Sequence, residues 1–336
     1  MSKINQVFDY VIDRLLPVGR VVRELPYVMI FKTTHWCWYN CAHCCESAGK
    51  DRPAEFIPAD VIKYYTDAAK SDPKFTKEIV LTGGEIMASY KFNMENYVPE
   101  LANYIAGRGI RMDIKTNGAW IRNNDLRTKI IPDLISVNER NSMQCRLPYQ
   151  LSLSLDKYHP NALENTYKII CEMARQNKNK PMILLHISGF MGQDWLYKEL
   201  LAKLLATRNT RIDYAYVAAK SGNAIPLHVI NRCVALRPSF EALLFAGGRA
   251  KNLPEAFPSK NPTFEIINND ADVLMAFDTM GNVTLGENSG RKITVPWRDK
   301  NGKPRQLPEI KRDLVRRARY EQLRQKVINL KNIFVK

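Results

Sequence analysis

Segments typical of buried strands alternate along this chain with segments typical of helices. Strand-like runs occupy residues 27–33, 78–81, 110–115, 150–155, 182–188 and 212–217. Helical periodicity fills most of the intervals between these runs. Because a strand, a helix and a second strand in succession form a parallel βαβ unit, the alternation predicts an α/β fold around a parallel sheet.

Polar or glycine-rich residues follow five of the six predicted strands. They are the cysteine-rich loop after 27–33, Thr82-Gly83-Gly84-Glu85, Thr116-Asn117-Gly118, Ser152 to His159, and Ser221-Gly222-Asn223-Ala224. In parallel α/β barrels, the loops at the C-terminal ends of the strands converge and carry the chemistry. We therefore expect these clusters to line one functional site.

Three cysteines in the first loop, Cys37, Cys41 and Cys44, have the spacing Cys-x3-Cys-x2-Cys. Thiolates this close together usually hold an iron–sulfur cluster or a zinc ion. Cys45 follows directly. The three remaining cysteines are dispersed: Cys145, Cys171 and Cys233. This is the pattern of a ligand set and not of a disulfide framework, and it favours a reducing cytoplasm.

With these motifs the chain resembles a radical S-adenosylmethionine (SAM) enzyme over residues 27–225, and it matches the cysteine hallmark of that superfamily without a gap. The resemblance implies a partial (β/α)6 barrel, similar to an incomplete TIM barrel. It implies that Cys37, Cys41 and Cys44 each bind one iron of a [4Fe–4S] cluster, whose fourth iron stays open for SAM. Cys45 is expected to be a thiol beside the cluster. His43 stands where the superfamily often has an aromatic residue.

Gly83, Gly84 and Glu85 match the superfamily motif that binds the amino group of SAM. Glycines let the backbone approach a ligand, and Glu85 offers a carboxylate to an ammonium group. The superfamily commonly continues with proline, where this chain has Ile86. A structural zinc site built from His35 and the cysteines is the alternative, but it would not explain the Gly-Gly-Glu motif.

The resemblance implies further SAM contacts on the later strands, at Asn117, Ser154, Asp156, Ser188 and Val217. Asn117 could bind cofactor or substrate, or be a turn residue that tolerates positive φ. Ser154 and Asp156 lie two residues apart and are expected to share one face, toward the ribose or the carboxylate of SAM. Ser188 belongs to a segment that resembles the small-residue stretch over which the adenine of SAM lies. Val217 matches the position whose backbone often contacts adenine.

Three further side chains near these strand ends are candidate functional residues. Tyr158 and His159 follow the fourth strand and are the candidate catalytic residues, as substrate binders or as an electron or proton relay. Their alternative role is loop packing before Pro160. His186 shares a face with Ser188, and it is equally well a core histidine or a functional one.

The implied cofactors define the implied reaction. A reduced cluster donates one electron to the sulfonium of SAM, the C5′–S bond breaks, and a 5′-deoxyadenosyl radical abstracts a hydrogen atom from the substrate. Such chemistry is oxygen-sensitive. It needs an external one-electron reductant such as flavodoxin or ferredoxin.

The residues beyond 225 are predicted to form an extension. The run from Met275 to Gly286 resembles the start of the SPASM or twitch extension of peptide-modifying radical SAM enzymes, in which a hairpin leads to an auxiliary cluster. This run contains no cysteine, so we expect a degenerate extension without a second cluster. The predicted division is an N-terminal helix in 1–26, a barrel in 27–225, an extension in 226–290 and a basic helical tail in 291–336.

Basic residues gather near the C-terminus of a chain with a net charge of +16. Residues 291–336 carry 15 Lys and Arg against 4 Asp and Glu. Such a segment could bind nucleic acid, an anionic membrane or an acidic partner. An amphipathic helix is favoured instead by apolar residues near helical spacing: Ile310, Leu314, Leu323, Val327 and Leu330. The segment lacks an aromatic-rich stacking surface, which disfavours nucleic acid.

Residues 4–16 have the periodicity of an amphipathic helix that ends before Pro17. We expect this helix to pack against the body, and an interfacial membrane anchor is the alternative. No run of 18 apolar residues and no signal-peptide pattern occurs in the sequence, so a cytoplasmic protein without a transmembrane segment is expected.

Three substrate classes are compatible with the sequence. A single cluster, with no peptide-recognition domain ahead of residue 27, favours a small natural-product, nucleotide or sugar-like metabolite. The resemblance at Phe277–Leu285 favours a ribosomally synthesised peptide. Only the basic tail favours RNA, and the complete cysteine and Gly-Gly-Glu motifs argue against a non-catalytic binding protein.

Overall fold

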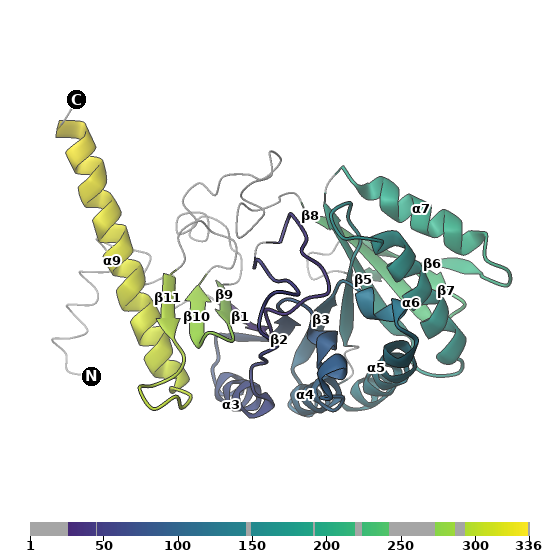
Figure 1. The fold of residues 1–336 in the computed structure, drawn as a ribbon, viewed down its shortest axis with the longest axis horizontal. Coiled ribbons are helices and arrows are strands. Elements are labelled where there is room, and N and C mark those ends of the chain that lie inside the picture. Colours follow the sequence, from purple (N-terminus) through teal and green to yellow (C-terminus); the bar gives the residue numbers. More distant parts are fainter. Residues whose placement is uncertain are drawn as a thin grey trace.

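A single β-sheet forms the centre of the protein in a computed structural model, which describes residues 26–44, 46–145, 149–190, 192–218, 224–241, 273–285 and 293–334. Over these residues the sheet has 11 strands in the order β11-β10-β9-β1-β2-β3-β4-β5-β8-β7-β6. Figure 1 shows this sheet running through the length of the molecule. The predicted N-terminal helix, Cys45, Ser221 to Asn223 and Gly286 lie outside the described residues.

Seven neighbouring strands of the described sheet are parallel. Six of them are β1 (Tyr27–Lys32), β2 (Phe75–Thr82), β3 (Arg111–Thr116), β4 (Gln150–Ser154), β5 (Ile183–Phe190) and β8 (Val234–Glu241), and the seventh, β9, belongs to the extension described below. The first five correspond to the first five predicted strands. The structure therefore confirms an α/β fold around a parallel sheet, consistent with the partial barrel that the resemblance implied.

The sixth predicted strand forms, but it does not lie beside β5 as expected. β6 (Ile212–Ala218) pairs antiparallel with β7 (Ala224–Ile230), and β7 pairs antiparallel with β8, which is the parallel neighbour of β5. The sequence analysis did not detect β7 and β8. Each contains a proline, Pro226 or Pro238, and proline lowers the strand propensity of a segment.

An antiparallel extension continues the sheet beyond β1. β9 (Val273–Phe277) pairs in parallel with β1, and β10 (Asn282–Leu285) and β11 (Ile293–Pro296) follow in antiparallel order. β9 and β10 form the hairpin that was predicted at the start of the extension. β11 lies in the segment that was predicted to be only a helical tail, so this segment begins with a strand of the sheet.

Helices pack against one face of the sheet. They are α3 (Ala59–Lys70), α4 (Tyr97–Ala106), α5 (Asn124–Cys145), α6 (Ala162–Gln176), α7 (Asp194–Leu205) and α9 (Leu307–Phe334), with short 3-10 turns η1 (Ile86–Phe92) and η2 (Ala119–Arg122). Figure 1 shows α3, α4 and α5 side by side below the sheet, opposite the loop that follows β1. In α3 the buried residues Ile62, Tyr65, Thr66 and Ala69 recur every three or four positions, which gives this helix its apolar face.

Alternate residues of the parallel strands face opposite sides of the sheet. One set, which includes Phe31, Leu81 and Ile114, belongs to the main hydrophobic core together with residues of the helices. The opposite face, which we call the helix-free face, carries the apolar residues Val28, Ile30 and Val80 and the charged residues Lys32 and Glu78 on β1 and β2. On β3, β4 and β5 it carries polar side chains: Asp113, Lys115, Gln150, Ser152 and His186.

The first half of α9 packs against the body. Ile310 and Leu314 are fully buried, as the predicted amphipathic pattern requires, whereas Leu323 is 51% exposed and does not continue that pattern. The Lys311 ammonium group forms an ion pair of 2.6 Å with Asp72. The side chains of Val327 and Leu330 lie outside the described set. Among the described residues, no helix has the length and hydrophobicity needed to cross a membrane.

Candidate functional site

The loop after β1 gathers the three predicted ligand cysteines. Cys37 and Cys41 are buried, and Cys44 is half-buried. The backbone N–H of Cys44 donates to the carbonyl of Cys41 at 3.2 Å, which closes a turn between the second and third cysteines. The N–H of Cys37 donates to the carbonyl of Gly49 at 3.2 Å and thereby joins the two sides of the loop.

N–H groups surround two of the sulfur atoms. The Sγ atom of Cys37 lies 3.2 Å from Nδ2 of Asn117 and 3.5 Å from the backbone nitrogen of Tyr39. The Sγ atom of Cys44 lies 3.4 Å from the backbone nitrogen of Ala48. Donors placed in this way stabilise negative charge on sulfur.

The thiol of Cys37 is difficult to ionise in the absence of a metal. Burial, together with the nearby Glu85 carboxylate, raises its pKa to about 12, although the hydrogen bond from the Tyr39 backbone opposes this shift. Cys41 and Cys44 also raise the pKa, which shows that the three sulfur atoms interact. None of the three forms a disulfide. A metal that binds thiolates would favour the deprotonated form of these three thiols.

The two glycines after β2 are required by the cysteine loop itself. A Cβ atom on Gly84 would lie 2.1 Å from the carbonyl oxygen of Trp36, and one on Gly83 would lie 2.5 Å from that of Thr34. Gly83 also has a φ of +124°, which side-chain-bearing residues rarely adopt. The Gly84 N–H donates to the Thr34 carbonyl at 2.6 Å. The sequence analysis explained these glycines by the approach of a ligand, whereas the contact seen here is with the loop that carries the cysteines.

Glu85 is buried at the centre of the strand ends. Its Oε1 accepts from the Thr116 hydroxyl at 2.7 Å and from the Met87 N–H at 3.1 Å, and its Oε2 accepts from the Asn117 N–H at 2.9 Å. Burial raises the pKa of this carboxyl to about 7, and the three hydrogen bonds oppose the shift. Each carboxylate oxygen can accept two hydrogen bonds, so Oε2 keeps capacity for one further donor such as an ammonium group.

Asn117 connects the cysteine loop with Glu85. Its backbone N–H binds Glu85, its Nδ2 binds the sulfur of Cys37, and its Oδ1 accepts from the Ala119 N–H at 2.9 Å. Gly118 follows with a φ of +70°, which allows the tight turn. The positive φ of this turn belongs to Gly118 and not to Asn117, and binding of cofactor or substrate by Asn117 stays a prediction.

Asp156 organises the loop after β4. Its Oδ1 accepts from the backbone N–H groups of Tyr158 and His159 at 2.9 and 3.1 Å, and its Oδ2 lies 2.7 Å from Nδ1 of His159. Burial raises the pKa of Asp156, but the contacts with His159 outweigh burial and hold it below its usual value. Asp156 lies beyond the end of β4, so the two-residue alternation that was expected to pair it with Ser154 does not apply.

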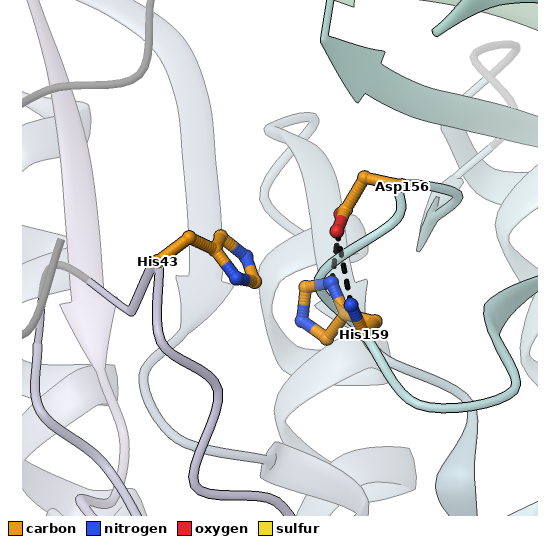
Figure 2. A group of neighbouring side chains, drawn as sticks. All are labelled: His43, Asp156 and His159. Carbon is orange, nitrogen blue, oxygen red and sulfur yellow. Dashed lines mark hydrogen bonds and ion pairs between the residues drawn. The ribbon is translucent and has the colours of Figure 1, made fainter. Parts of the chain in front are cut away.

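His43 brings the cysteine loop against the loop after β4. Its ring lies 4.5 Å from that of His159 and 5.0 Å from that of Tyr158, and Phe190 at the end of β5 lies 5.9 Å away. Figure 2 shows His43 facing the hydrogen-bonded pair of His159 and Asp156. The sequence analysis noted His43 only as a variant of a motif. Its contact with residues more than a hundred positions away has no local sequence signal.

A metal ion could in principle bind His43, Asp156 and His159, because they offer ligand atoms within 4.8 Å of one another. The oxygens of Asp156 already accept three hydrogen bonds within the chain. The arrangement therefore suits a carboxylate that orients a histidine better than it suits a metal ligand.

Ser188 and Val217 occupy different parts of the sheet. Ser188 pairs with Ser154 across β4 and β5, near the strand ends that hold Asn117 and Asp156. Val217 lies near the end of β6, the sixth predicted strand, which β7 and β8 separate from β5, and its contact with adenine stays a prediction. The strand next to β5 on this side is β8.

Comparison with known proteins assigns the first half of the parallel sheet to a family. Residues 31–138, from β1 to within α5, match the Radical SAM superfamily. This part of the chain is a radical SAM domain. The superfamily uses a [4Fe–4S] cluster together with SAM. The three neighbouring thiols, with N–H donors around two of them, are a donor set that fits such a cluster.

Two solved structures that are similar to this chain are those of SuiB from Streptococcus suis. The structure of SuiB bound to S-adenosylmethionine has 12% sequence identity and a TM-score of 0.36, and the match covers 77% of this chain and 60% of that one. The structure of SuiB bound to its precursor peptide SuiA has 13% identity and a TM-score of 0.37, and the match covers 77% and 59%. The chain thus spans about three fifths of SuiB. No protein with a curated description matches the sequence.

Proposed function

We propose that Cys37, Cys41 and Cys44 hold the [4Fe–4S] cluster of this radical SAM enzyme. The observation that carries the proposal is the position of Asn117, which contacts the Cys37 sulfur and the Glu85 carboxylate at the same time. This contact joins the cysteine motif and the Gly-Gly-Glu motif in one site, although the two motifs are separate in the sequence.

SAM binds beside the cluster in this proposal. Glu85 accepts the amino group of SAM through the remaining capacity of Oε2, and Asn117, Ser154, Asp156 and Ser188 line the adjacent strand ends. When bound, the cluster and SAM supply a 5′-deoxyadenosyl radical after transfer of one electron from an external reductant of the flavodoxin or ferredoxin class.

Tyr158 and His159 are the proposed catalytic residues, and Asp156 orients His159. The low pKa of Asp156 keeps its carboxylate ionised, so the 2.7 Å contact requires a proton on Nδ1 of His159. The aromatic rings of His43 and Phe190 pack around Tyr158 and exclude water from this side.

A ribosomally synthesised peptide is the substrate that the structure supports best. The hairpin of β9 and β10 forms in the segment whose sequence resembles the extension of peptide-modifying radical SAM enzymes. β9 extends the same sheet as the radical SAM domain, which places this extension against the barrel. A small metabolite remains the alternative, and the second experiment below distinguishes the two.

The first experiment tests the cluster ligands. The protein is reconstituted anaerobically with iron and sulfide, reduced with dithionite in the presence of SAM, and assayed for 5′-deoxyadenosine by mass spectrometry. We expect the wild type to form 5′-deoxyadenosine. The control variant Cys171→Ala, whose cysteine lies on α6, should form it as well. Cys41→Ala should bind less iron than the wild type and form less 5′-deoxyadenosine. Wild-type product and iron in Cys41→Ala would contradict the assignment.

The second experiment tests the substrate class. Short peptides encoded beside the gene are added to the reduced enzyme with SAM, and formation of 5′-deoxyadenosine is compared with that given by scrambled peptides and by a metabolite extract below 1 kDa. A peptide substrate predicts stimulation and a change in peptide mass only with the native sequence. Stimulation by the extract alone would assign the enzyme to small molecules.

A further inference from the structure

Four polar side chains form a row across the helix-free face of the sheet. Lys115 on β3 pairs in register with Ser152 on β4, Ser152 with His186 on β5, and His186 with Arg237 on β8. Residues in register on neighbouring parallel strands present their side chains on the same face. The flanking residues, such as Leu151 and Leu185, belong to the main core, so the row faces away from the helices.

The hydrogen bonds around His186 fix the position of its proton. The Ser152 hydroxyl donates to Asp113 at 2.6 Å, so Ser152 cannot also donate to the imidazole. The Oε1 atom of Gln150 accepts from Arg111 at 3.2 Å, which turns its Nε2 donor toward Nδ1 of His186, 3.2 Å away. Nδ1 is therefore an acceptor.

The ring is neutral at physiological pH. Burial, together with the positive charges of Arg237, Lys115 and Arg111, lowers the pKa of His186 to about 4. A neutral ring that accepts at Nδ1 carries its proton on Nε2. This Nε2–H makes no hydrogen bond with any residue in the described part of the chain, and it is available to a ligand.

Arg237 is a cation of this face that has no ion pair among the described residues. The guanidinium of Arg111 lies 3.8 Å from Glu78, and Asp113 interacts electrostatically with Lys115. Arg237 and the neutral N–H of His186 match a monoanion such as a carboxylate, whose oxygens accept well from a guanidinium and from a neutral N–H.

Along the strands, the row lies before the strand ends that form the proposed SAM site, so it could hold a substrate below the cofactor. Lys115 and Ser152 each stand two residues before Asn117 and Ser154, which belong to the proposed SAM site. Two residues of a strand span about 7 Å. A ligand with its carboxylate on the row can therefore extend a carbon chain of a few bonds to the level of the strand ends.

We propose that His186 and Arg237 form a receptor for a carboxylate group of the substrate. The inference rests on the proposed function, because it places the substrate beneath SAM. In a peptide substrate this group is the side chain of an acidic residue or the terminal carboxylate. Both present the same chemistry to the row.

The test measures binding directly and does not depend on radical chemistry. The protein, reconstituted with its cluster, is labelled with 15N-histidine, and the Nε2 signal of His186 is followed during titration with N-acetylglutamic acid α-methylamide, N-acetylglycine or their uncharged amides. Both carboxylates present one anionic group, but only the first mimics an acidic side chain within a peptide. We expect at least tenfold weaker binding of the amides.

Two variants and one competitor complete the test. Arg237→Gln is expected to weaken carboxylate binding at least tenfold, whereas Arg232→Gln, in the exposed turn between β7 and β8, leaves it unchanged. Circular dichroism establishes that Arg237→Gln is folded. Equal binding of acid and amide, or no effect of Arg237→Gln, would overturn the proposal. So would displacement of the carboxylate by saturating SAM, because the row would then hold the carboxylate of SAM itself.

The outcomes also separate this inference from the proposed function. If the wild-type enzyme forms 5′-deoxyadenosine but binds neither carboxylate, the radical SAM function stands and the receptor proposal is wrong. Wild-type enzyme that binds a carboxylate without forming 5′-deoxyadenosine keeps an anion receptor and loses the proposed reaction.

Discussion

The side-chain Nδ2 of Asn117 donates a hydrogen bond of 3.2 Å to the sulfur of Cys37, 80 residues earlier in the chain. Hydrogen bonds to cysteine sulfur stabilise the reduced, more negative state of an iron–sulfur cluster and so raise its reduction potential. The turn after β3 is thus able to adjust how readily the proposed cluster accepts an electron.

Asn117→Ala removes this donor and is expected to make the reduction potential of the cluster more negative. The measurement is a potentiometric titration of the reconstituted protein, monitored by electron paramagnetic resonance. Asn123→Ala is the matched control, because Asn123 caps the next turn through its bond with Leu126 and touches none of the described cysteines. An unchanged potential in Asn117→Ala would mean that the contact has no electronic role.

Gly84→Ala is expected to prevent assembly of the cluster. The new methyl group would lie 2.1 Å from the Trp36 carbonyl and would push the cysteine loop away from β2. Gly109→Ala is the control, because Gly109 has a φ of +68° but open space around it, so that variant meets only backbone strain of about 1 kcal/mol. Iron content per chain after reconstitution distinguishes the two, and full iron content in Gly84→Ala would refute the steric argument.

Thr116→Val is expected to lower the free energy of unfolding by about 1–3 kcal/mol. The hydroxyl of Thr116 donates to Glu85 and accepts from the Gly118 N–H and the Trp120 indole, both at 3.1 Å, and valine leaves all three partners buried without it. Thr66→Val on α3 loses only a bond to a helix carbonyl and should cost less. Urea unfolding measures both values, and equal costs would show that the network around Glu85 adds nothing.

The free energy of unfolding should fall as the pH is lowered from about 6.5 to about 4. The pKa of His186 is near 4 in the folded protein and 6.5 in an unfolded chain. The unfolded state therefore binds more protons in this interval, and acid favours it. Urea titrations at several pH values should show this slope in the wild type and a shallower slope in His186→Gln. The same slope in both would assign the acid sensitivity to other groups.

Most of the parallel sheet could be predicted from the sequence. The apolar runs of β1 to β5 are separated by helical segments, and the cysteine and Gly-Gly-Glu motifs mark two strand ends. Each of these signals is local, because it depends on residues within one element or one turn.

The parts that the sequence did not predict depend on contacts between distant residues. Nothing within 212–217 shows that β7 and β8 lie between β6 and β5. Likewise, the packing of His43 against Tyr158 joins two loops that are each unremarkable in sequence. The two glycines were recognised as part of a motif, but the surface that requires them became visible only with the position of the cysteine loop.

The pairing of β1 with both β2 and β9 has a consequence for biosynthesis. All six residues of β1 become buried, yet its second neighbour β9 is synthesised more than 200 residues after it. Until then β1 presents an unpaired apolar edge, the kind of surface that nucleates aggregation. We expect the nascent protein to require chaperones until β9 has been translated, and a product truncated before β9 to be insoluble.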